Sequence, residues 1–143
     1  MPTRSASAEW SGAPVGGSGR MRLGSGAYEG EYSFPSRFED AVGTNPEELL
    51  GAAHAGCFSM FLGKLLADAG RPAVSIQTEA DVQLVKSDAG YSITQIDLRT
   101  FGHVPGISAD DFSRQAETAK VDCPVSRALA GVEITLQASL ANS

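Results

Sequence analysis

Residues 43–70 read GTNPEELLGAAHAGCFSMFLGKLLADAG, and this stretch decides the fold of the chain. Apolar residues fall on almost every side of a helix drawn through it, which is typical of a helix buried on most sides. Gly70 and then Pro72 are the residues that end such a helix. We therefore predict one helix of about 24 residues, roughly 36 Å long at the usual rise per residue.

The start of this helix is marked by capping residues. Thr44 followed by Glu47, and Asn45 followed by Glu48, both fit a capping box, in which a polar side chain and a carboxylate satisfy unpaired backbone N–H groups. Pro46 suits the first turn, where its missing N–H has no partner in any case. The two carboxylates also suit the positive end of the helix dipole.

A membrane span is the competing interpretation of the same stretch. A spanning helix needs an uninterrupted apolar run near 18 residues. Charged and polar side chains interrupt this one at five places, namely Glu47, Glu48, His54, Lys64 and Asp68. We therefore predict a buried helix and no membrane partner.

Length and charge limit the classes of protein that fit. The chain has 143 residues, so we expect a single domain over 1–143, and 42% hydrophobic residues are enough for a core. The net charge is −6, with 11 Lys and Arg and no basic run, which argues against nucleic acid as a partner. The N-terminus lacks the apolar run of a signal peptide, so we expect a cytoplasmic protein.

The remaining sequence predicts short strands around the long helix. Gly- and Ser-rich segments suggest a small meander with strands at 7–10, 19–23 and 27–33. Residues 34–42 are expected to be irregular. Beyond the helix we predict a hairpin of strands 73–86 and 91–101, helices at 109–121 and 124–129, and a strand at 132–140. This order predicts an α+β fold with antiparallel sheets around a long buried central helix.

The predicted elements are too few to cover the long helix. One hairpin, one meander and two short helices cannot enclose an apolar rod of roughly 36 Å. A symmetric dimer that packs two such helices together would cover it. We therefore expect a symmetric homodimer.

Two cysteines, Cys57 and Cys123, lie 66 positions apart. They form no CxxC motif and no zinc spacing with the two histidines, so no metal site is predicted. A structural disulfide is not expected in a cytosolic protein. The cysteines are thus either inert buried thiols or redox-active ones.

Each cysteine has an inert and a reactive interpretation. Cys57 in mid-helix fits a core thiol. Cys123 precedes Pro124 and is expected to cap a short helix, either as a simple N-cap or as a thiolate stabilised by the unpaired N–H groups there. Together they suggest a peroxidatic and resolving pair, in which one thiolate becomes a sulfenic acid and the second thiol condenses with it.

Cys57 would need a cation to become a thiolate, and the candidates are Arg37 and His54. Arg37 is the better one, because its charge survives burial and its planar fork can bridge several oxygen and sulfur atoms. His54 lies three residues before Cys57, so a Cys–His pair for acyl transfer is conceivable. A hydrogen-bonded core histidine is the alternative. His103, close to Pro105, is expected on a surface loop.

Three motifs resemble those of the OsmC/Ohr family, the osmotically inducible and organic-hydroperoxide-resistance proteins. They are GTNPEELLGAAHAGCFSMFL, FPSRFED and VDCPVSRAL, and the resemblance covers nearly the full chain. The AAHA and SRFED segments resemble the OsmC branch more than the Ohr branch. The resemblance implies a thiol peroxidase for organic hydroperoxides, less active on hydrogen peroxide, and an intertwined α+β homodimer with two sites at its interface.

The resemblance also implies roles for four residues. Cys57 matches the peroxidatic cysteine, Cys123 the resolving one, Arg37 the arginine that holds the thiolate, and Glu47 the glutamate that pairs with this arginine. The implied reductant is a dithiol, with lipoylated proteins favoured, and no cofactor is implied. Glu47 and Cys57 are roughly 15 Å apart along one helix. If Glu47 directs Arg37 at Cys57, we therefore expect it to come from the partner subunit.

Two other classes of function remain open from the residues. One is a Cys–His hydrolase or acyltransferase, which requires His54 within hydrogen-bond reach of Cys57. The other is a non-catalytic dimer that binds small molecules. Phe58 and Phe61 either line an access route for alkyl peroxides or pack in the core.

Overall fold

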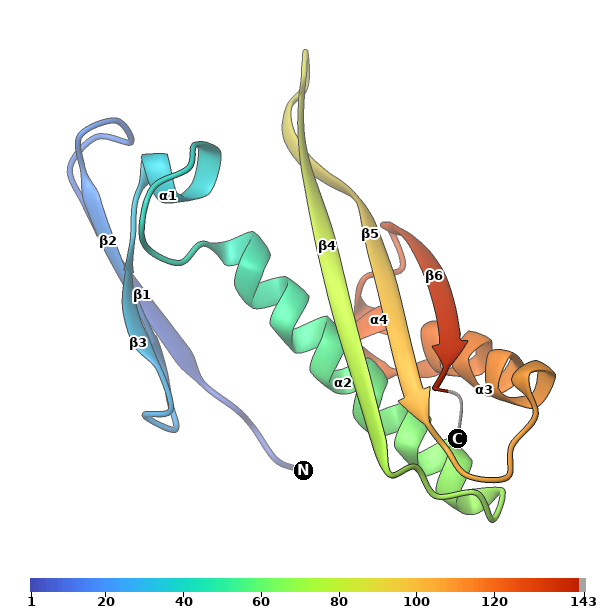
Figure 1. The fold of residues 1–143 in the computed structure, drawn as a ribbon. Helices are drawn as coiled ribbons and strands as arrows, with labels where there is room; N and C mark the ends of the chain where they lie inside the picture. Colours follow the sequence, from blue (N-terminus) through green and yellow to red (C-terminus); the bar gives the residue numbers. More distant parts are fainter. Residues whose placement is uncertain (142–143) are drawn as a thin grey trace. The chain divides into compact units, whose positions relative to one another are not determined.

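The computed structural model describes residues 1–141 and has the predicted α+β class (Figure 1). The chain folds into two compact units, Met1–Leu49 and a second that begins at Leu50. The boundary falls within the long helix, three residues after Pro46. Each unit is described by itself.

The first unit contains the predicted meander. Strands β1 (Ala6–Ser11), β2 (Ser18–Leu23) and β3 (Glu29–Tyr32) form an antiparallel sheet in that order. The turn between β2 and β3 closes with an N–H of Gly26 donating to the carbonyl of Leu23 at 2.9 Å.

A short helix, α1 (Phe34–Phe38), follows β3, so the prediction of irregular structure over 34–42 was wrong for these residues. Ser33 and Ser36 form a capping box, in which each side chain accepts the backbone N–H of the other. Pro35 lies in the first turn, where a missing N–H costs nothing. Two capping serines and a proline therefore start a helix where proline alone suggested a break.

The long helix, α2 (Pro46–Asp68), has 23 residues, close to its predicted bounds. Asn45 caps it, because its Oδ1 accepts the N–H of Glu48 at 2.7 Å. The predicted box between Thr44 and Glu47 is absent, since the Thr44 hydroxyl donates to the Glu48 carboxylate at 2.8 Å. The Glu47 carboxylate instead accepts hydrogen bonds from Arg37.

The second unit contains a three-stranded sheet and three helical segments. The hairpin of β4 (Ser75–Ser87) and β5 (Gly90–His103) is antiparallel, as predicted. Helices α3 (Ala109–Asp122) and α4 (Pro124–Ala128) lead to β6 (Glu133–Leu140). His103 is the last residue of β5, so its placement on a surface loop was wrong.

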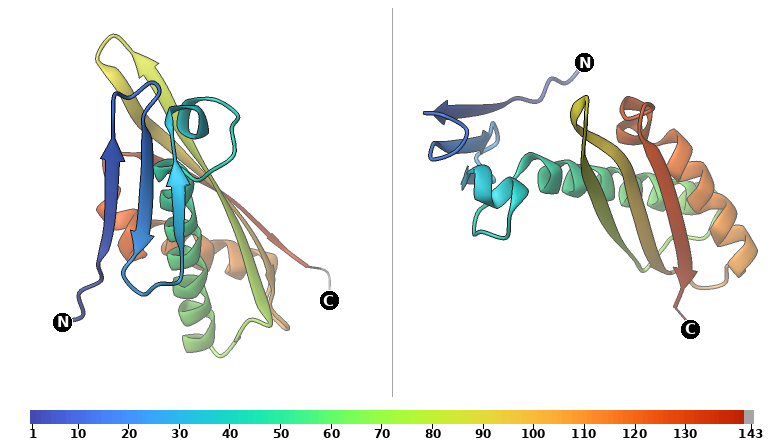
Figure 2. Two further views of the ribbon diagram at one scale, coloured as in Figure 1. Left: turned by 90° about the vertical axis from the view of Figure 1, so that its left-hand side faces the viewer. Right: turned by 90° about the horizontal axis from the view of Figure 1, so that it is seen from above.

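Strand β6 pairs with β5 in parallel, unlike the antiparallel arrangement predicted for all strands. Parallel neighbours need a crossover connection, and α3 with α4 provides it. Figure 2 shows the crossover returning the chain to the same sheet.

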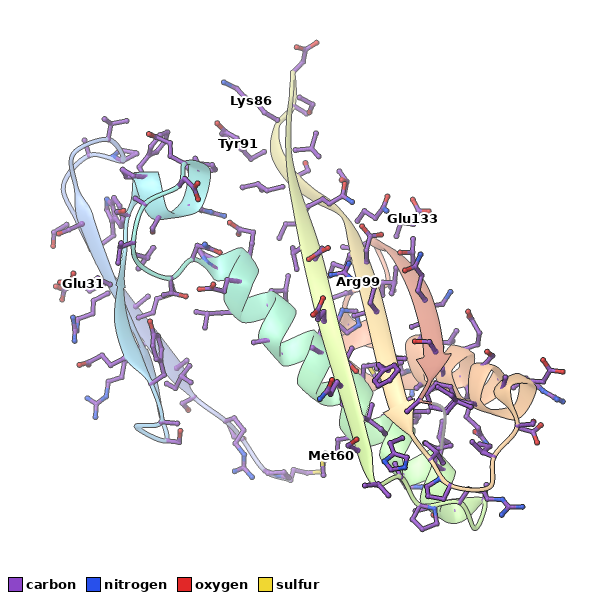
Figure 3. All side chains as sticks on the ribbon, in the orientation of Figure 1. Glu31, Met60, Lys86, Tyr91, Arg99 and Glu133 are labelled. Carbon is purple, nitrogen blue, oxygen red and sulfur yellow. The ribbon has the colours of Figure 1, made fainter. Side chains whose placement is uncertain are left out.

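The core of the second unit lies between its helices and one face of its sheet. Alternate residues of β5 point to this face, as strand geometry requires. They meet side chains of α2 and α3 in one buried cluster that includes Phe58, Leu62, Leu66, Ile96, Leu98 and Phe112. The opposite face carries Arg99, which is paired with Glu79 and Asp81 (Figure 3).

Within the described chain, helix α2 is buried along one stripe, in line with the expectation that one chain cannot cover it. The stripe consists of His54, Phe58, Leu62 and Leu66, each with no exposed surface. Met60 on another face of the helix (labelled in Figure 3) is 83% exposed. By length and composition alone α2 could cross a membrane, and 28% of its apolar window is buried.

Candidate active site

The fold brings Cys57 and Cys123 together, although 66 residues separate them in the sequence. Cys57 lies in the middle of α2, and Cys123 lies at the junction of α3 and α4. The Cys123 thiol and the backbone N–H of Val125 both lie close enough to the Cys57 sulfur to shift the pKa of its thiol. Cys57 is half-buried and Cys123 is fully buried, and both are reduced. The fold thus makes the two thiols neighbours.

Burial raises the pKa of the Cys57 thiol above its ordinary value, because a thiolate is poorly solvated there. The Val125 N–H opposes this by stabilising the thiolate, while the neighbouring Cys123 raises the pKa further. Within the second unit, Cys57 is therefore held mainly as a thiol.

Cys123 is the N-cap of α4, as predicted, and it interacts with Ser126 twice. The backbone N–H of Ser126 donates to the Cys123 sulfur at 3.4 Å, and the Cys123 thiol donates to the Ser126 hydroxyl at 3.2 Å. Sequence reasoning did not identify Ser126. The signal was present, because the third helical residue is the one that faces an N-cap side chain.

His54 is fully buried beside the cysteines but contacts Ser126. Its Nε2 lies 2.7 Å from the Ser126 hydroxyl oxygen, and its Nδ1 is buried with no hydrogen-bond partner among the described residues. Burial lowers the pKa of His54 below its ordinary value of 6.5, so the ring is neutral near pH 7. The requirement of the Cys–His alternative, a hydrogen bond between His54 and Cys57, is therefore not met.

Arg37 and Glu47 form a two-pronged ion pair within the first unit. Nε and Nη2 of Arg37 donate to the two carboxylate oxygens at 2.8 and 3.1 Å, which is the strong, planar form of this contact. Glu47 is 7% exposed, whereas the Arg37 side chain is 37% exposed. The ion pair thus fixes the orientation of the guanidinium, and part of the Arg37 side chain remains exposed to solvent.

Hydrogen bonds between α1 and the start of α2 hold this ion pair in place. The Ser36 hydroxyl donates to the carbonyl of Thr44 at 2.8 Å, and the Asn45 amide donates to the carbonyl of Ser36 at 3.0 Å. Arg37 also borders an aromatic pocket of about 230 Å³, which is lined by Trp10, Pro14, Tyr32, Ser33, Phe34, Arg37 and Phe38.

An open pocket of about 540 Å³ lies over Cys57 in the second unit and is lined by Cys57, Met60, Phe61, Lys64 and Pro124. Phe61 therefore borders the thiol, as one interpretation of the sequence suggested. Phe58 has no exposed surface and belongs to the core, which is the alternative interpretation. Among residues 1–141, no three His, Cys, Asp or Glu side chains gather in a way that could hold a metal ion.

Two facing cysteines on an α+β fold, one of them at an apolar pocket, define a candidate thiol redox site. The model of the OsmC-like protein family matches residues 38–137, and the chain belongs to this family. It is 48% identical over 134 residues to peroxiredoxin OsmC of Escherichia coli, with 93% of each chain covered.

More distant relatives and solved structures agree with this family. The chain is 35% identical over 97 residues to the organic hydroperoxide resistance protein OhrA of Bacillus subtilis, with 66% of each chain covered. An OsmC-like protein from Mycoplasma pneumoniae shares the fold with a TM-score of 0.77 at 13% identity, with 99% of each chain covered.

Proposed function

We propose that this protein is a cysteine-based peroxidase that reduces organic hydroperoxides, and hydrogen peroxide less well. The observation that carries the proposal is the proximity of the Cys57 and Cys123 thiols, with Cys57 at an apolar pocket. The names of the relatives, peroxiredoxin OsmC and organic hydroperoxide resistance protein, support the same activity. In this proposal residues 1–143 act as one soluble, cytoplasmic OsmC-like domain.

The proposed cycle uses both thiols in turn. The Cys57 thiolate attacks the distal oxygen of the hydroperoxide, the O–O bond breaks, and the alkoxide leaves as an alcohol after protonation. Cys57 is now a sulfenic acid. Cys123 attacks its sulfur, water leaves, and a Cys57–Cys123 disulfide forms. An external dithiol, such as the lipoyl group of a lipoylated protein, reduces the disulfide by thiol exchange.

The cation that this cycle requires is Arg37. Burial raises the pKa of Cys57, so the thiolate needs a positive charge that is held beside it. Arg37 keeps its charge when buried and is held by Glu47. Its fork would stabilise the thiolate and orient the peroxide oxygen.

We propose that Arg37 and Glu47 act on Cys57 of a second copy in a homodimer. Glu47 and Cys57 lie on one helix, ten residues and roughly 15 Å apart along its axis, so the ion pair and the thiol of one chain are separated. Antiparallel crossing of two α2 helices would bring the pair of each chain toward the thiol of the other. It would also cover the apolar face around Met60.

The pocket supports organic substrates over hydrogen peroxide. Apart from the Lys64 ammonium and the thiol itself, the pocket lining is apolar. Binding an alkyl group there removes its apolar surface from water, which is favourable. Hydrogen peroxide has no such group. We therefore expect a higher kcat/KM for cumene hydroperoxide than for hydrogen peroxide, measured in the presence of dihydrolipoamide.

A thiol count during turnover tests the function directly. Reduced protein is mixed with cumene hydroperoxide, and peroxide loss and free thiols are followed together. We expect one equivalent of peroxide to be consumed with the loss of both thiols. Cys57→Ser should consume none, whereas Cys123→Ser should oxidise once and stop at the sulfenic acid. Full turnover by Cys57→Ser would show that the mechanism is wrong.

The two other functions predict different outcomes. A Cys–His hydrolase would hydrolyse activated esters and lose this activity in His54→Ala, but His54 contacts Ser126 and no observation favours this function. A non-catalytic binding dimer would keep both thiols free in the presence of peroxide. The thiol count therefore separates the peroxidase from the other two functions, and ester hydrolysis separates the hydrolase from the binding dimer.

A further inference from the structure

His54 is a buried titratable group that the proposed cycle does not use. It has no exposed surface, it lies on the buried stripe of α2, and its Nε2 is 2.7 Å from the Ser126 hydroxyl. The same hydroxyl accepts the thiol proton of Cys123 at 3.2 Å. His54 of α2, Ser126 of α4 and Cys123 at the junction of α3 and α4 thus form one hydrogen-bonded chain that ends at the resolving cysteine.

A proton relay along this chain uses one tautomer of His54, with the ring proton on Nδ1 and a lone pair on Nε2. The Cys123 sulfur accepts the backbone N–H of Ser126 and donates its own proton to the Ser126 oxygen. A hydroxyl that accepts one hydrogen bond has its single proton free to donate. The atom within reach of that proton is Nε2 of His54, which accepts with its lone pair when the ring is neutral and its own proton is on Nδ1.

We propose that Ser126 and His54 form a proton relay that takes the thiol proton of Cys123 when this residue attacks the Cys57 sulfenic acid. The proposal rests on the proposed peroxidase function. Cys123 is fully buried, so water cannot accept its proton directly. Ser126 and His54 are positioning residues for the resolving step, and Cys123 remains the attacking group.

The step is balanced by the groups already named. The Cys123 S–H bond breaks, its proton moves to the Ser126 oxygen, and the Ser126 proton moves to Nε2 of His54. The Cys123 thiolate forms an S–S bond with the Cys57 sulfur, whose S–O bond breaks. The hydroxide takes up the proton that the relay has held and leaves as water. The Cys57 sulfur is reduced, the Cys123 sulfur is oxidised, and no further oxidant is needed.

The relay keeps its hydrogen bonds in both states. Before transfer, the Cys123 thiol donates to the Ser126 hydroxyl, which donates to Nε2 of His54. After transfer, Nε2 of His54 donates to the Ser126 hydroxyl, which donates to the Cys123 sulfur. The Ser126 backbone N–H points at the sulfur throughout, where it stabilises a thiolate. Burial lowers the pKa of His54, which keeps its ring neutral and able to take up a proton.

Kinetics that separate the two chemical steps test the proposal. Reduced full-length protein is mixed with cumene hydroperoxide and quenched rapidly, and mass spectrometry distinguishes the Cys57 sulfenic acid from the disulfide. In His54→Gln and Ser126→Ala we expect disulfide formation to slow on the order of 10²-fold, the usual effect of losing a general base. The rate of Cys57 oxidation should change less than about twofold, since the relay acts only on the second step.

Matched variants separate a relay from a structural role. Ser59→Ala removes another α2 hydroxyl, which donates to Thr78 and lies outside the relay, and should leave both steps unchanged. Ser126→Thr retains the hydroxyl and should recover most of the resolving rate. The double variant of His54→Gln and Ser126→Ala should be no slower than either single one. If His54→Gln does not fold, the comparison of Ser126→Ala with Ser126→Thr decides the question.

Each outcome is informative. The wild-type disulfide step should be slower in D₂O than in H₂O, and this difference should vanish in Ser126→Ala. Disulfide formation at the wild-type rate in that variant would overturn the relay, as would an equal loss in both chemical steps. If the wild type forms no sulfenic acid at all, the proposed function fails and the relay fails with it.

Discussion

At the scale of single residues, the Arg37–Glu47 pair is the part of the site whose geometry is most restricted. Two nitrogens of one guanidinium meet the two oxygens of one carboxylate, and Glu47 is nearly buried. A lysine carries the same charge but has no planar fork. Replacing Arg37 by lysine therefore separates the effect of its charge from the effect of its oriented N–H groups.

Arg37→Lys should slow the oxidation of Cys57 by cumene hydroperoxide on the order of 10²-fold, because the oriented donors are lost while the charge remains. The second-order rate constant, measured by rapid quench, checks this. Arg99→Lys is the matched control, since Arg99 also contacts two carboxylates but lies on the other face of the β4–β5–β6 sheet. A wild-type rate in Arg37→Lys would rule out an orienting role.

His54 makes stability depend on pH in a defined window. Burial lowers its folded pKa below 6.5, so below this pH the unfolded chain binds a proton that the folded chain does not. The free energy of unfolding should therefore fall as the pH falls from about 6.5 to the folded pKa, by up to about 1.4 kcal/mol per pH unit.

Urea unfolding at a series of pH values measures this slope, and His54→Gln should remove it. Asp97 does not interfere with the measurement. Hydrogen bonds from Thr135, Gln95 and Gln83 lower its pKa below 3.8, so its contribution to the free energy of unfolding is lost only at more acidic pH. An unchanged slope just below pH 6.5 in His54→Gln would contradict the assignment.

At the scale of elements, the end of α2 depends on one glycine. Gly70 has φ of +77°, and the N–H groups of Gly70 and Arg71 donate to the carbonyls of Ala67 and Leu66. This is a Schellman motif, which satisfies the last carbonyls of the helix and needs a left-handed residue. An added Cβ at Gly70 would meet no atom within 4 Å, so any cost is conformational.

Gly70→Ala should lower the free energy of unfolding by about 1–2 kcal/mol, the cost of the left-handed conformation. Gly70→Asn should lose less, because asparagine tolerates this conformation. Gly63→Ala, within α2, should have the opposite sign and stabilise by about 0.5–1 kcal/mol; its Cβ would make an ordinary contact with Ile76. Chemical denaturation of the three variants checks these values, and equal effects of Gly70→Ala and Gly63→Ala would contradict them.

At the scale of the whole molecule, the uncovered face of α2 is the feature to explain. The helix is apolar enough to resemble a membrane span, yet only one stripe of it is buried in the described chain. A second copy would cover the remaining face and complete each site with an Arg37–Glu47 pair. Oligomeric state and activity should therefore change together.

Met60→Asp should convert a dimer to a monomer of 14.9 kDa and abolish peroxide reduction, because a charge would be buried between the helices. Sedimentation equilibrium and the cumene hydroperoxide assay measure the two effects. Val121→Asp on α3 is the control, since Val121 is also exposed and apolar but lies on another element. A monomeric wild type with full activity would refute the dimer.

Elements with local signals could be predicted from the sequence. They are the bounds of α2, the strands of the meander and the hairpin, and the N-cap at Cys123. Caps, turns and alternation depend on residues within a few positions of each other. Helix α1 was missed because Pro35 was interpreted only as the end of a strand. The capping box of Ser33 and Ser36 starts a helix there, with Pro35 in its first turn. The parallel direction of β6 was missed because pairing depends on where the crossover returns the chain.

The sequence by itself determined the class of fold, the family and the two thiols with their possible cation, because these rest on local patterns and on motifs. Only the tertiary structure placed Ser126 between Cys123 and His54, a contact across 72 residues. It also decided for Glu47 between the two predicted contacts, a pair with Arg37 and a capping box with Thr44. The physical reason is that such contacts depend on how α4 and α1 pack against α2. Packing of distant elements follows from burial of the whole core and from no single stretch.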